Sequence, residues 1–93
     1  MRLNKEQLRI LELLKKRPHR YSEIMNTTGY SYQIMNNNLN NLLKRKIVER
    51  KEKTENTYYY ITEKGEEEYK QELISRTNRE HRQIRKFEEV DHF

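Results

Sequence analysis

One proline and two glycines are the only strong breaks in this chain of 93 residues, and they restrict where helices can begin and end. Before Pro18, the apolar residues of the stretch 5–16 recur at spacings of three and four, which is typical of an amphipathic helix. Asn4 and Gln7 have the spacing of a capping box at its start. Pro18 should end this helix, because the residue before a proline avoids helical backbone angles.

Two further helices are predicted on either side of Gly29. Ser22 is the expected cap of a short second helix, with Tyr21 as the hydrophobic residue before the cap and Gly29 as a left-handed stop. Ser31 is the expected cap of a third helix at about 32–45. The apolar residues of this third helix fall on one core-facing stripe: Met35, Leu39 and Leu42.

A β-hairpin is predicted after the third helix. The segments 47–53 and 57–62 are rich in β-branched and aromatic residues, and the polar residues 54–56 separate them. Alternation along the second segment places Tyr59 and Ile61 on the core side. The two remaining tyrosines of this segment should then lie on the opposite face.

The last part of the chain reads as one long helix. Thr62 is its expected cap, and the glutamates that follow suit the positive end of a helix dipole. Beyond Ile74 no apolar residue occurs before Ile84, so this stretch cannot be buried in a single core. We therefore predict a domain at 1–74 and a helical extension at 75–93.

The element order is helix, helix, helix, strand, strand, helix, with a short extra strand at 19–21 that could pair with the hairpin. The predicted fold class is α+β, mainly α. Only 32% of the residues are hydrophobic and 38% are charged, which indicates one small domain with a thin core.

Positive charge is concentrated in the first two-thirds of the chain. Residues 1–62 carry 13 Lys and Arg against 6 Asp and Glu, whereas residues 63–93 carry 7 against 9. A basic front of this kind suits a polyanionic partner, although ordinary surface charge for solubility explains the same numbers.

The chain lacks the residues that several classes of function require. The chain has no cysteine, and the spacing of His19, His81 and His92 does not resemble a metal site. Neither a nucleophile with its base nor a glycine-rich phosphate loop is present. We expect no enzymatic activity, no cofactor and no small-molecule ligand. The start lacks a signal-peptide pattern and no apolar run would span a membrane, so we expect a cytoplasmic protein.

Four segments in this order resemble the winged helix-turn-helix transcription regulators. They are "YSEIMNTTGYS", "SYQIMNNNLNNLLKRKIV", "KRKIVERK" and "YYYITEKGEEEY", and together they cover roughly residues 5–73. The likeness is closest to regulators of the multiple-antibiotic-resistance and arsenic-repressor types, and to small archaeal and archaeal-virus winged-helix proteins. Lys46 departs from the family pattern, which has glycine before the strand, so we expect a strained backbone there.

The resemblance implies that the third helix enters the major groove of double-stranded DNA. Its outward face would carry the base-reading residues Tyr32, Gln33, Asn36, Asn37 and Asn40. Asn and Gln can form two hydrogen bonds to adenine, each good pair giving about 1–3 kcal/mol of discrimination. That outweighs the few tenths of a kcal/mol of helix propensity lost per asparagine. The alternative is that an A·T-rich genome simply favours asparagine codons.

The phosphate contacts are predicted for a second set of residues that flank this face or lie on the hairpin. They are Arg20, Ser31, Lys44, Arg45, Arg50, Lys51 and Lys53. Individually, each basic residue could equally be a solvated surface charge.

Regulators of this family usually bind as dimers, and the long last helix is the candidate dimer element. Its imperfect apolar stripe consists of Tyr69, Leu73, Ile74, Thr77, His81, Ile84 and Phe87. Leu3, Leu8 and Leu13 could extend it, and the alternative is a solvated monomeric tail. The expected function is sequence-specific DNA binding by a homodimeric transcription regulator. The alternatives are a non-specific architectural DNA-binding protein and a winged helix used for protein contact.

Overall fold

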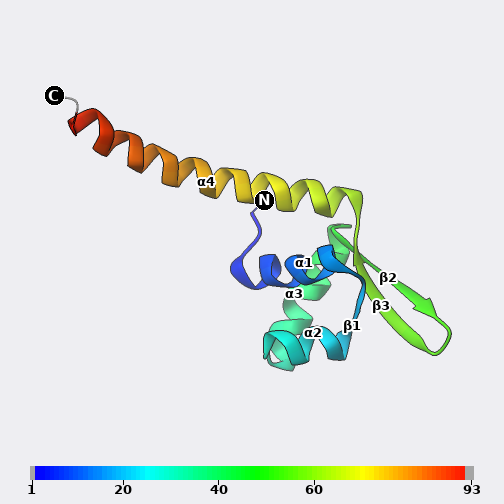
Figure 1. Ribbon diagram of the computed structural model, residues 1–93. Coiled ribbons are helices and arrows are strands. Elements are labelled where there is room, and N and C mark those ends of the chain that lie inside the picture. The colour runs from blue at the N-terminus through cyan, green and yellow to red at the C-terminus, as the bar shows by residue number, and fades with distance from the viewer. Residues whose placement is uncertain (1, 92–93) are drawn as a thin grey trace.

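The computed structural model describes the backbone of residues 2–91 and the side chains of residues 2–77 (Figure 1). Four helices and three strands follow one another along the chain. They are α1 (Lys5–Lys16), β1 (His19–Arg20), α2 (Tyr21–Thr28), α3 (Tyr32–Lys44), β2 (Val48–Lys53), β3 (Asn56–Ile61) and α4 (Glu63–Asp91). The predicted α+β, mainly helical fold class and the order of the elements are confirmed.

The three strands form one antiparallel sheet in the order β1-β3-β2. The predicted extra strand exists but is only two residues long, with Arg20 opposite Tyr58 of the central strand. The hairpin turn is shorter than expected, because Asn56 already pairs with Lys53. Only Thr54 and Glu55 remain in the turn, and Thr54 has a positive φ of 58°.

The first helix begins as its sequence indicates. The Gln7 backbone N–H donates to Asn4 Oδ1 at 2.7 Å, and the Asn4 N–H donates to Gln7 Oε1 at 3.0 Å. These reciprocal bonds satisfy two of the backbone donors that a helix start leaves open. The predicted capping box is therefore confirmed.

The predicted cap of the second helix is wrong by two positions. The helix starts at Tyr21, and Arg20 instead of Ser22 occupies the cap position. The reason is Glu23, whose carboxylate accepts the Arg20 backbone N–H at 2.8 Å. Glu23, the third residue of the helix, thus bonds back to the cap residue, and the helix starts before Ser22.

The turn between α2 and α3 follows the sequence signals. Gly29 has a φ of 75°, in the left-handed region that glycine adopts without steric cost. Ser31 Oγ then accepts the Ile34 backbone N–H at 3.3 Å and caps α3 as predicted. The third helix ends at Lys44, one residue before its predicted end.

Lys46 has a φ of 63°, so the strained backbone expected at this position is confirmed. Thr62 lies against the same segment, and its hydroxyl reaches the Lys46 and Ile47 carbonyl oxygens at 2.6 and 3.1 Å. The Thr62 hydroxyl also accepts the Gly65 backbone N–H at 3.0 Å, as a helix cap. A Cβ at Gly65 would lie 2.2 Å from the Ile47 carbonyl oxygen. Glycine is therefore needed where α4 crosses the start of β2.

The core lies between the first three helices and the inner face of the sheet. The predicted stripe of α3 is fully buried, with Met35 and Leu42 at 0% exposure and Leu39 at 2%. Tyr59 is buried as predicted, and Ile61 packs half-buried against the same cluster. Leu3, Leu8 and Leu13 also belong to this core. They are therefore not available to extend a dimer face, because they pack within their own chain.

The last helix leaves the domain as a long rod (Figure 1). It runs without interruption through residue 75, where the predicted domain boundary lies. None of the helices among the described residues has the length and apolar character that crossing a membrane requires.

Candidate nucleic-acid interface

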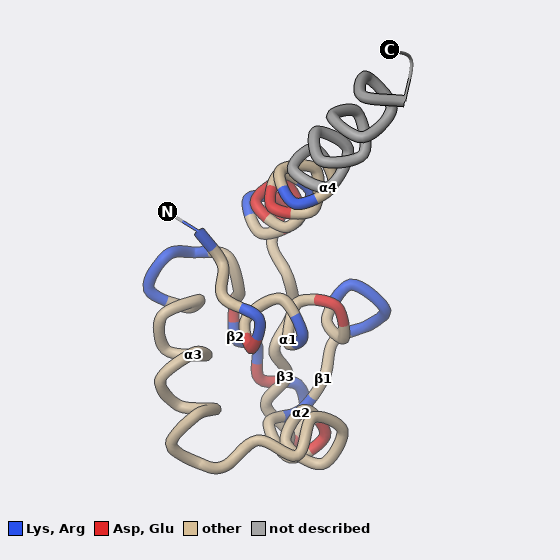
Figure 2. Tube along the Cα trace, turned by 90° about the vertical axis from the view of Figure 1, so that its left-hand side faces the viewer, with Lys and Arg blue, Asp and Glu red and all other residues tan. Residues whose placement is uncertain are grey.

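The outer face of α3 presents amide side chains and no charge. Gln33, Asn36, Asn37 and Asn40 are all exposed, and Tyr32 at the start of the helix is 65% exposed. The tube of α3 is tan until its last turn, and the next blue segment is the basic loop that follows it (Figure 2). This face is therefore a neutral hydrogen-bonding surface that ends at a cluster of positive charge.

The five asparagines of α3 separate into two groups. Asn38 and Asn41 face α1, where the Asn4 amide donates to Asn38 Oδ1 at 2.9 Å and the Gln7 amide donates to Asn41 Oδ1 at 3.0 Å. Each of these two asparagines bonds a residue 34 positions earlier in the sequence and so ties α3 to α1. The sequence pattern does not reveal this structural role, because the partners lie on a distant part of the chain.

Asn36 lies at the edge of the outer face that is nearest to α2. The Tyr21 hydroxyl donates to Asn36 Oδ1 at 2.8 Å. The Tyr21 ring packs between Tyr32 and Tyr59, at centroid distances of 5.5 and 6.5 Å. Burial, and then the neighbouring Tyr32 and Tyr59, raise the pKa of Tyr21. Its hydroxyl therefore remains protonated at neutral pH and can donate.

At the start of α2, the Glu23 carboxylate accepts hydrogen bonds from the Arg20 backbone and the Arg17 side chain. Its hydrogen bond from the Arg20 backbone, followed by its bond from the Arg17 side chain, lowers the pKa of its carboxyl to about 2. Arg20, a predicted phosphate contact, lies 3.6 Å from the same carboxylate, although almost half of its side chain is exposed.

The other predicted phosphate contacts near α3 differ in their exposure and in their hydrogen bonds within the protein. Ser31 and Lys44 are exposed. Arg45 is half-buried, with its guanidinium 3.4 Å from Asn41 Oδ1, and its carbonyl oxygen accepts a 2.8 Å hydrogen bond from Lys64. Arg45 is thus partly engaged within the protein.

The three predicted wing residues do not share one face of the hairpin. Because directly paired residues lie on the same side of a sheet, Arg50 shares the core side with its partner Tyr59. Lys51 pairs with Tyr58 and so lies on the opposite side, together with Lys53. The structure therefore brings Lys51 and Lys53 together and separates Arg50 from them.

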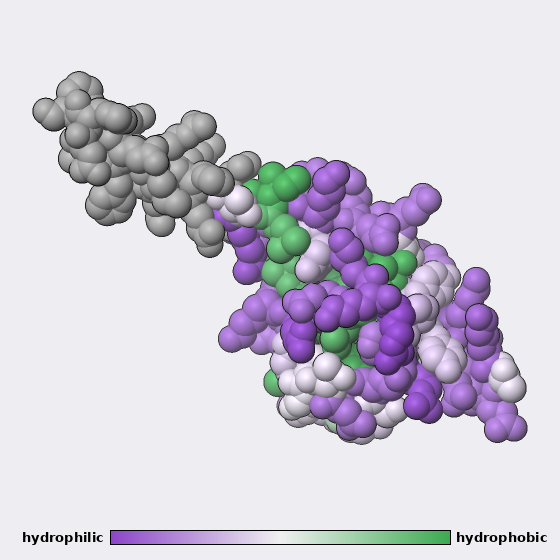
Figure 3. All heavy atoms as spheres, in the orientation of Figure 1, coloured by the Kyte–Doolittle hydropathy of each residue, from purple (hydrophilic) through white to green (hydrophobic). Residues whose placement is uncertain are grey.

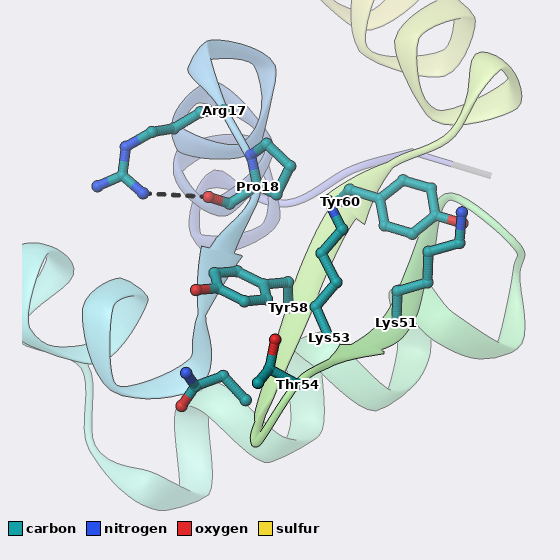
Figure 4. A pocket seen from close by; sticks show the side chains of 8 residues that line it. Arg17, Pro18, Lys51, Lys53, Thr54, Tyr58 and Tyr60 are labelled. Carbon is teal, nitrogen blue, oxygen red and sulfur yellow. Dashed lines mark hydrogen bonds between the residues drawn. The ribbon is translucent and has the colours of Figure 1, made fainter.

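Lys51 and Lys53 line an open hollow of about 580 Å³ on the outer side of the wing (Figure 4). Arg17 and Pro18 line its other side, Tyr58 lies between them and Lys53, and the Tyr60 ring lies beside Lys51 (Figure 4). Lys51 Nζ lies 5.5 Å from the centre of the Tyr60 ring, whose hydroxyl donates to Glu49. This surface combines positive charge with aromatic rings.

The predicted dimerisation stripe is described only as far as Thr77. Leu73 and Ile74 are 43% and 42% exposed and are neighbours in the sequence, so they form an exposed apolar pair on α4. Apolar side chains, green in Figure 3, are visible where α4 leaves the domain. His81, Ile84 and Phe87 have side chains outside the described residues, so their part of the stripe stays a prediction.

Tyr69 is the buried member of this stripe. It is 9% exposed and packs against the core, and Lys15 Nζ lies 5.1 Å from the centre of its ring. A second hollow of about 590 Å³ lies beside it, lined by Lys15, Glu63, Glu66, Glu67, Tyr69, Lys70, Leu73 and Ile74. Tyr69 thus connects the core to the exposed apolar pair.

Residues that could bind a metal are scattered. Among the residues that the structure describes, no three His, Asp or Glu side chains lie close enough together to hold an ion.

The fold and this surface together define a helix-turn-helix with a hairpin wing, in which α2 and α3 form the motif and β2 and β3 form the wing. A family model described as winged helix-turn-helix matches residues 7–85. The chain belongs to this winged helix-turn-helix family.

Solved structures support the same assignment. The reduced transcriptional regulator YodB from Bacillus subtilis is 30% identical over 67% of this chain and 65% of its own, with a TM-score of 0.62. YusO from Bacillus subtilis gives a TM-score of 0.80 at 20% identity, over 88% of this chain and 61% of its own. Mb0332 from Mycobacterium bovis, a homodimeric winged helix-turn-helix DNA-binding domain, is 26% identical over 84% of this chain and 71% of its own, with a TM-score of 0.67.

This chain spans less than two-thirds of the length of YodB and YusO. A search of curated protein sequences gave no match.

Proposed function

We propose that this protein binds double-stranded DNA in a sequence-specific manner as a homodimer and regulates transcription. The main support is the uncharged amide surface of α3, in a family whose second motif helix enters the major groove. The proposed location is the cytoplasm.

The chemistry of the α3 surface suits base reading better than phosphate binding. An amide offers both a donor and an acceptor, whereas lysine and arginine only donate. Gln33, Asn37 and Asn40 are exposed and lie on one side of the helix. Bidentate pairing of such an amide with adenine N6 and N7 would favour A·T pairs at the contacted positions.

Selection of bound duplexes from a random pool tests this proposal. The wild-type protein should enrich a motif, and replacing Asn37 and Asn40 with alanine should flatten it while non-specific binding remains. Asn26→Ala is the matched control, because Asn26 is an exposed asparagine on α2 and not on α3. A pool without any enriched motif would favour the architectural alternative.

The wing and the flanking basic residues would supply the salt-dependent part of the affinity. Phosphate contacts bind all sequences alike and release counterions. Replacing Lys51 and Lys53 together should therefore weaken every duplex equally and reduce the salt slope by about two units, roughly one for each lost contact. Arg50→Ala is a useful comparison, since Arg50 lies on the other side of the hairpin.

The homodimer is proposed on the exposed pair Leu73 and Ile74, beside buried Tyr69. Mb0332, which shares 26% identity, is itself described as homodimeric. A second copy covering this pair would remove apolar surface from water, which is the main driving force of association.

A mass measurement in solution tests the dimer. Replacing Leu73 and Ile74 with glutamate should produce monomers at concentrations where the wild type is a dimer. Gln71→Glu is the control, because Gln71 is exposed on α4 but does not line the hollow beside Tyr69. A wild-type mass of one chain would refute the dimer without affecting the DNA proposal.

A further inference from the structure

The three consecutive tyrosines of β3 lie in different surroundings. Tyr59 is buried in the core. The Tyr60 hydroxyl donates to Glu49, and Lys51 Nζ lies 5.5 Å from the centre of the Tyr60 ring. Tyr58 is half-buried, and no hydrogen bond, ring contact or cation–π contact involves it within the part of the chain whose side chains are described. Of the three rings, the Tyr58 ring is the one left for a ligand.

Tyr58 lines the open hollow of about 580 Å³ on the outer side of the wing. Its ring lies between Pro18 and Lys53, and Lys51 follows further along the same side (Figure 4). Because Tyr59 points into the core, strand alternation turns Tyr58 away from it, together with its directly paired neighbour Lys51. The ring and the two lysines therefore face solvent on one surface.

The positive charge of this hollow comes from Lys51 and Lys53. Both are exposed, and no ion pair involves them among the described side chains. Arg17 also lines the hollow, but its guanidinium donates to the Pro18 carbonyl oxygen at 3.1 Å and to the Glu23 carboxylate at 3.2 Å. Within the described residues, no Asp or Glu lines the hollow. The two lysines thus retain their charge for a ligand.

An aromatic ring beside two unpaired lysines matches the chemistry of a nucleotide. The ring can stack on a base, and the lysines can neutralise the phosphates next to it. Duplex DNA could use the lysines but not the ring, because the faces of its internal bases are covered by their neighbours and unstacking them costs free energy. The ring therefore favours a strand whose bases are unpaired.

We propose that the outer side of the wing binds single-stranded DNA, with an unpaired base stacked on Tyr58 and the adjoining phosphates at Lys51 and Lys53. This activity goes beyond duplex reading by α3. DNA is proposed over RNA because α3 and the wing belong to one domain, so a strand opened beside a bound duplex would be the nearest polyanion. In that choice the inference rests on the proposed function.

Binding of a fluorescent thymidine oligonucleotide about 12 nucleotides long, a length within the range of known single-strand sites, tests the proposal. Tyr58→Leu keeps an apolar side chain and removes the ring, so it should weaken binding by about five- to 150-fold, the range of one base–aromatic stack. Tyr58→Phe is the matched control. It keeps the ring and removes a hydroxyl that has no partner among the described residues, so it should bind as the wild type does.

An oligonucleotide with the same phosphates and abasic sugars separates stacking from charge. The wild type should bind it more weakly by the same factor, and Tyr58→Leu should not distinguish the two oligonucleotides. Replacing Lys51 and Lys53 with alanine should weaken both oligonucleotides alike. It should also reduce the salt slope by about 1.4 units, roughly 0.7 for each lost phosphate contact on a single strand.

The outcomes keep this inference apart from the proposed function. A folded Tyr58→Leu variant, judged by circular dichroism, that binds the oligonucleotide as tightly as the wild type refutes the stacking role. A wild type that does not distinguish the abasic strand refutes it as well. An RNA oligonucleotide that binds more tightly than DNA overturns the choice of DNA.

Binding of a selected duplex is measured in parallel. Tyr58→Leu should leave duplex binding unchanged, and an equal loss on duplex and single strand overturns the inference. If the wild type selects no duplex motif but binds the oligonucleotide through Tyr58, the proposed function fails while the stacking role stands.

Discussion

The two sides of α3 use the same residue for opposite purposes. On the side toward α1, Asn38 and Asn41 accept hydrogen bonds from Asn4 and Gln7, and the helix is tied to its neighbour. On the outer side, Asn37 and Asn40 are exposed, and no side-chain hydrogen bond involves them within residues 2–77. We call these the anchored side and the open side.

The comparison shows that residue type does not determine the role of an amide in this helix. On the anchored side the amide replaces an apolar contact and adds direction, since a hydrogen bond fixes both distance and angle. On the open side the same group costs helix propensity and gains nothing within the protein. Helix propensity lost without an internal hydrogen bond in return is expected where the side chains bind a partner.

The largest contrast is expected for Asn41→Ala on the anchored side. Gln7 is only 5% exposed, so the loss of Asn41 leaves its amide buried without that acceptor. An unsatisfied buried polar group costs about 1–3 kcal/mol, and the free energy of unfolding should fall by that amount. Urea titration would measure it.

Asn38→Ala serves as the comparison on the same side, because its bond to Asn4 is exposed and should cost less. A variant Asn41→Ala that is as stable as the wild type would contradict the anchored role.

The elements of the fold could be predicted because their signals are local. The capping box of Asn4 and Gln7, the left-handed Gly29 and the apolar stripe of α3 all depend on residues within one turn or one helix. Even the strain at Lys46 was visible as a departure from a family pattern. The error at Ser22 has the same origin, since Glu23 offered a competing local cap.

The anchoring contacts could not be predicted because they join distant parts of the chain. Asn38 and Asn41 meet partners 34 positions away, and a helical wheel shows a face but not what covers it. The Tyr21 hydroxyl likewise reaches Asn36 only through the angle between α2 and α3. The wing residues were grouped by charge, whereas strand alternation separates Arg50 from Lys51 and Lys53.

A smaller effect of opposite sign is expected on the open side. Alanine is a better helix former than asparagine by up to about 0.7 kcal/mol, and Asn37 and Asn40 have no side-chain partner to lose among the described residues. Replacing either with alanine should therefore leave stability unchanged or raise it by a few tenths of a kcal/mol. The same urea titration checks this, and a loss above about 1 kcal/mol, the size of one hydrogen bond, would show an internal contact.

The smallest effect should appear in acid, at the edge where the open side meets α2. Hydrogen bonds from the Arg20 backbone and then from Arg17 lower the pKa of Glu23 to about 2, from 4.5 for the free side chain. A depressed pKa means that the carboxylate stabilises the fold above about pH 4.5, and that this contribution is lost as the pH falls toward 2. Glu23→Gln should lower the melting temperature slightly at pH 7 and make it less sensitive to acid between pH 4.5 and 2. Arg17→Ala should retain most of that sensitivity, because the backbone hydrogen bond to Glu23 is the larger cause. If Arg17→Ala removes as much of it as Glu23→Gln, the ion pair and not the helix start is what acid breaks.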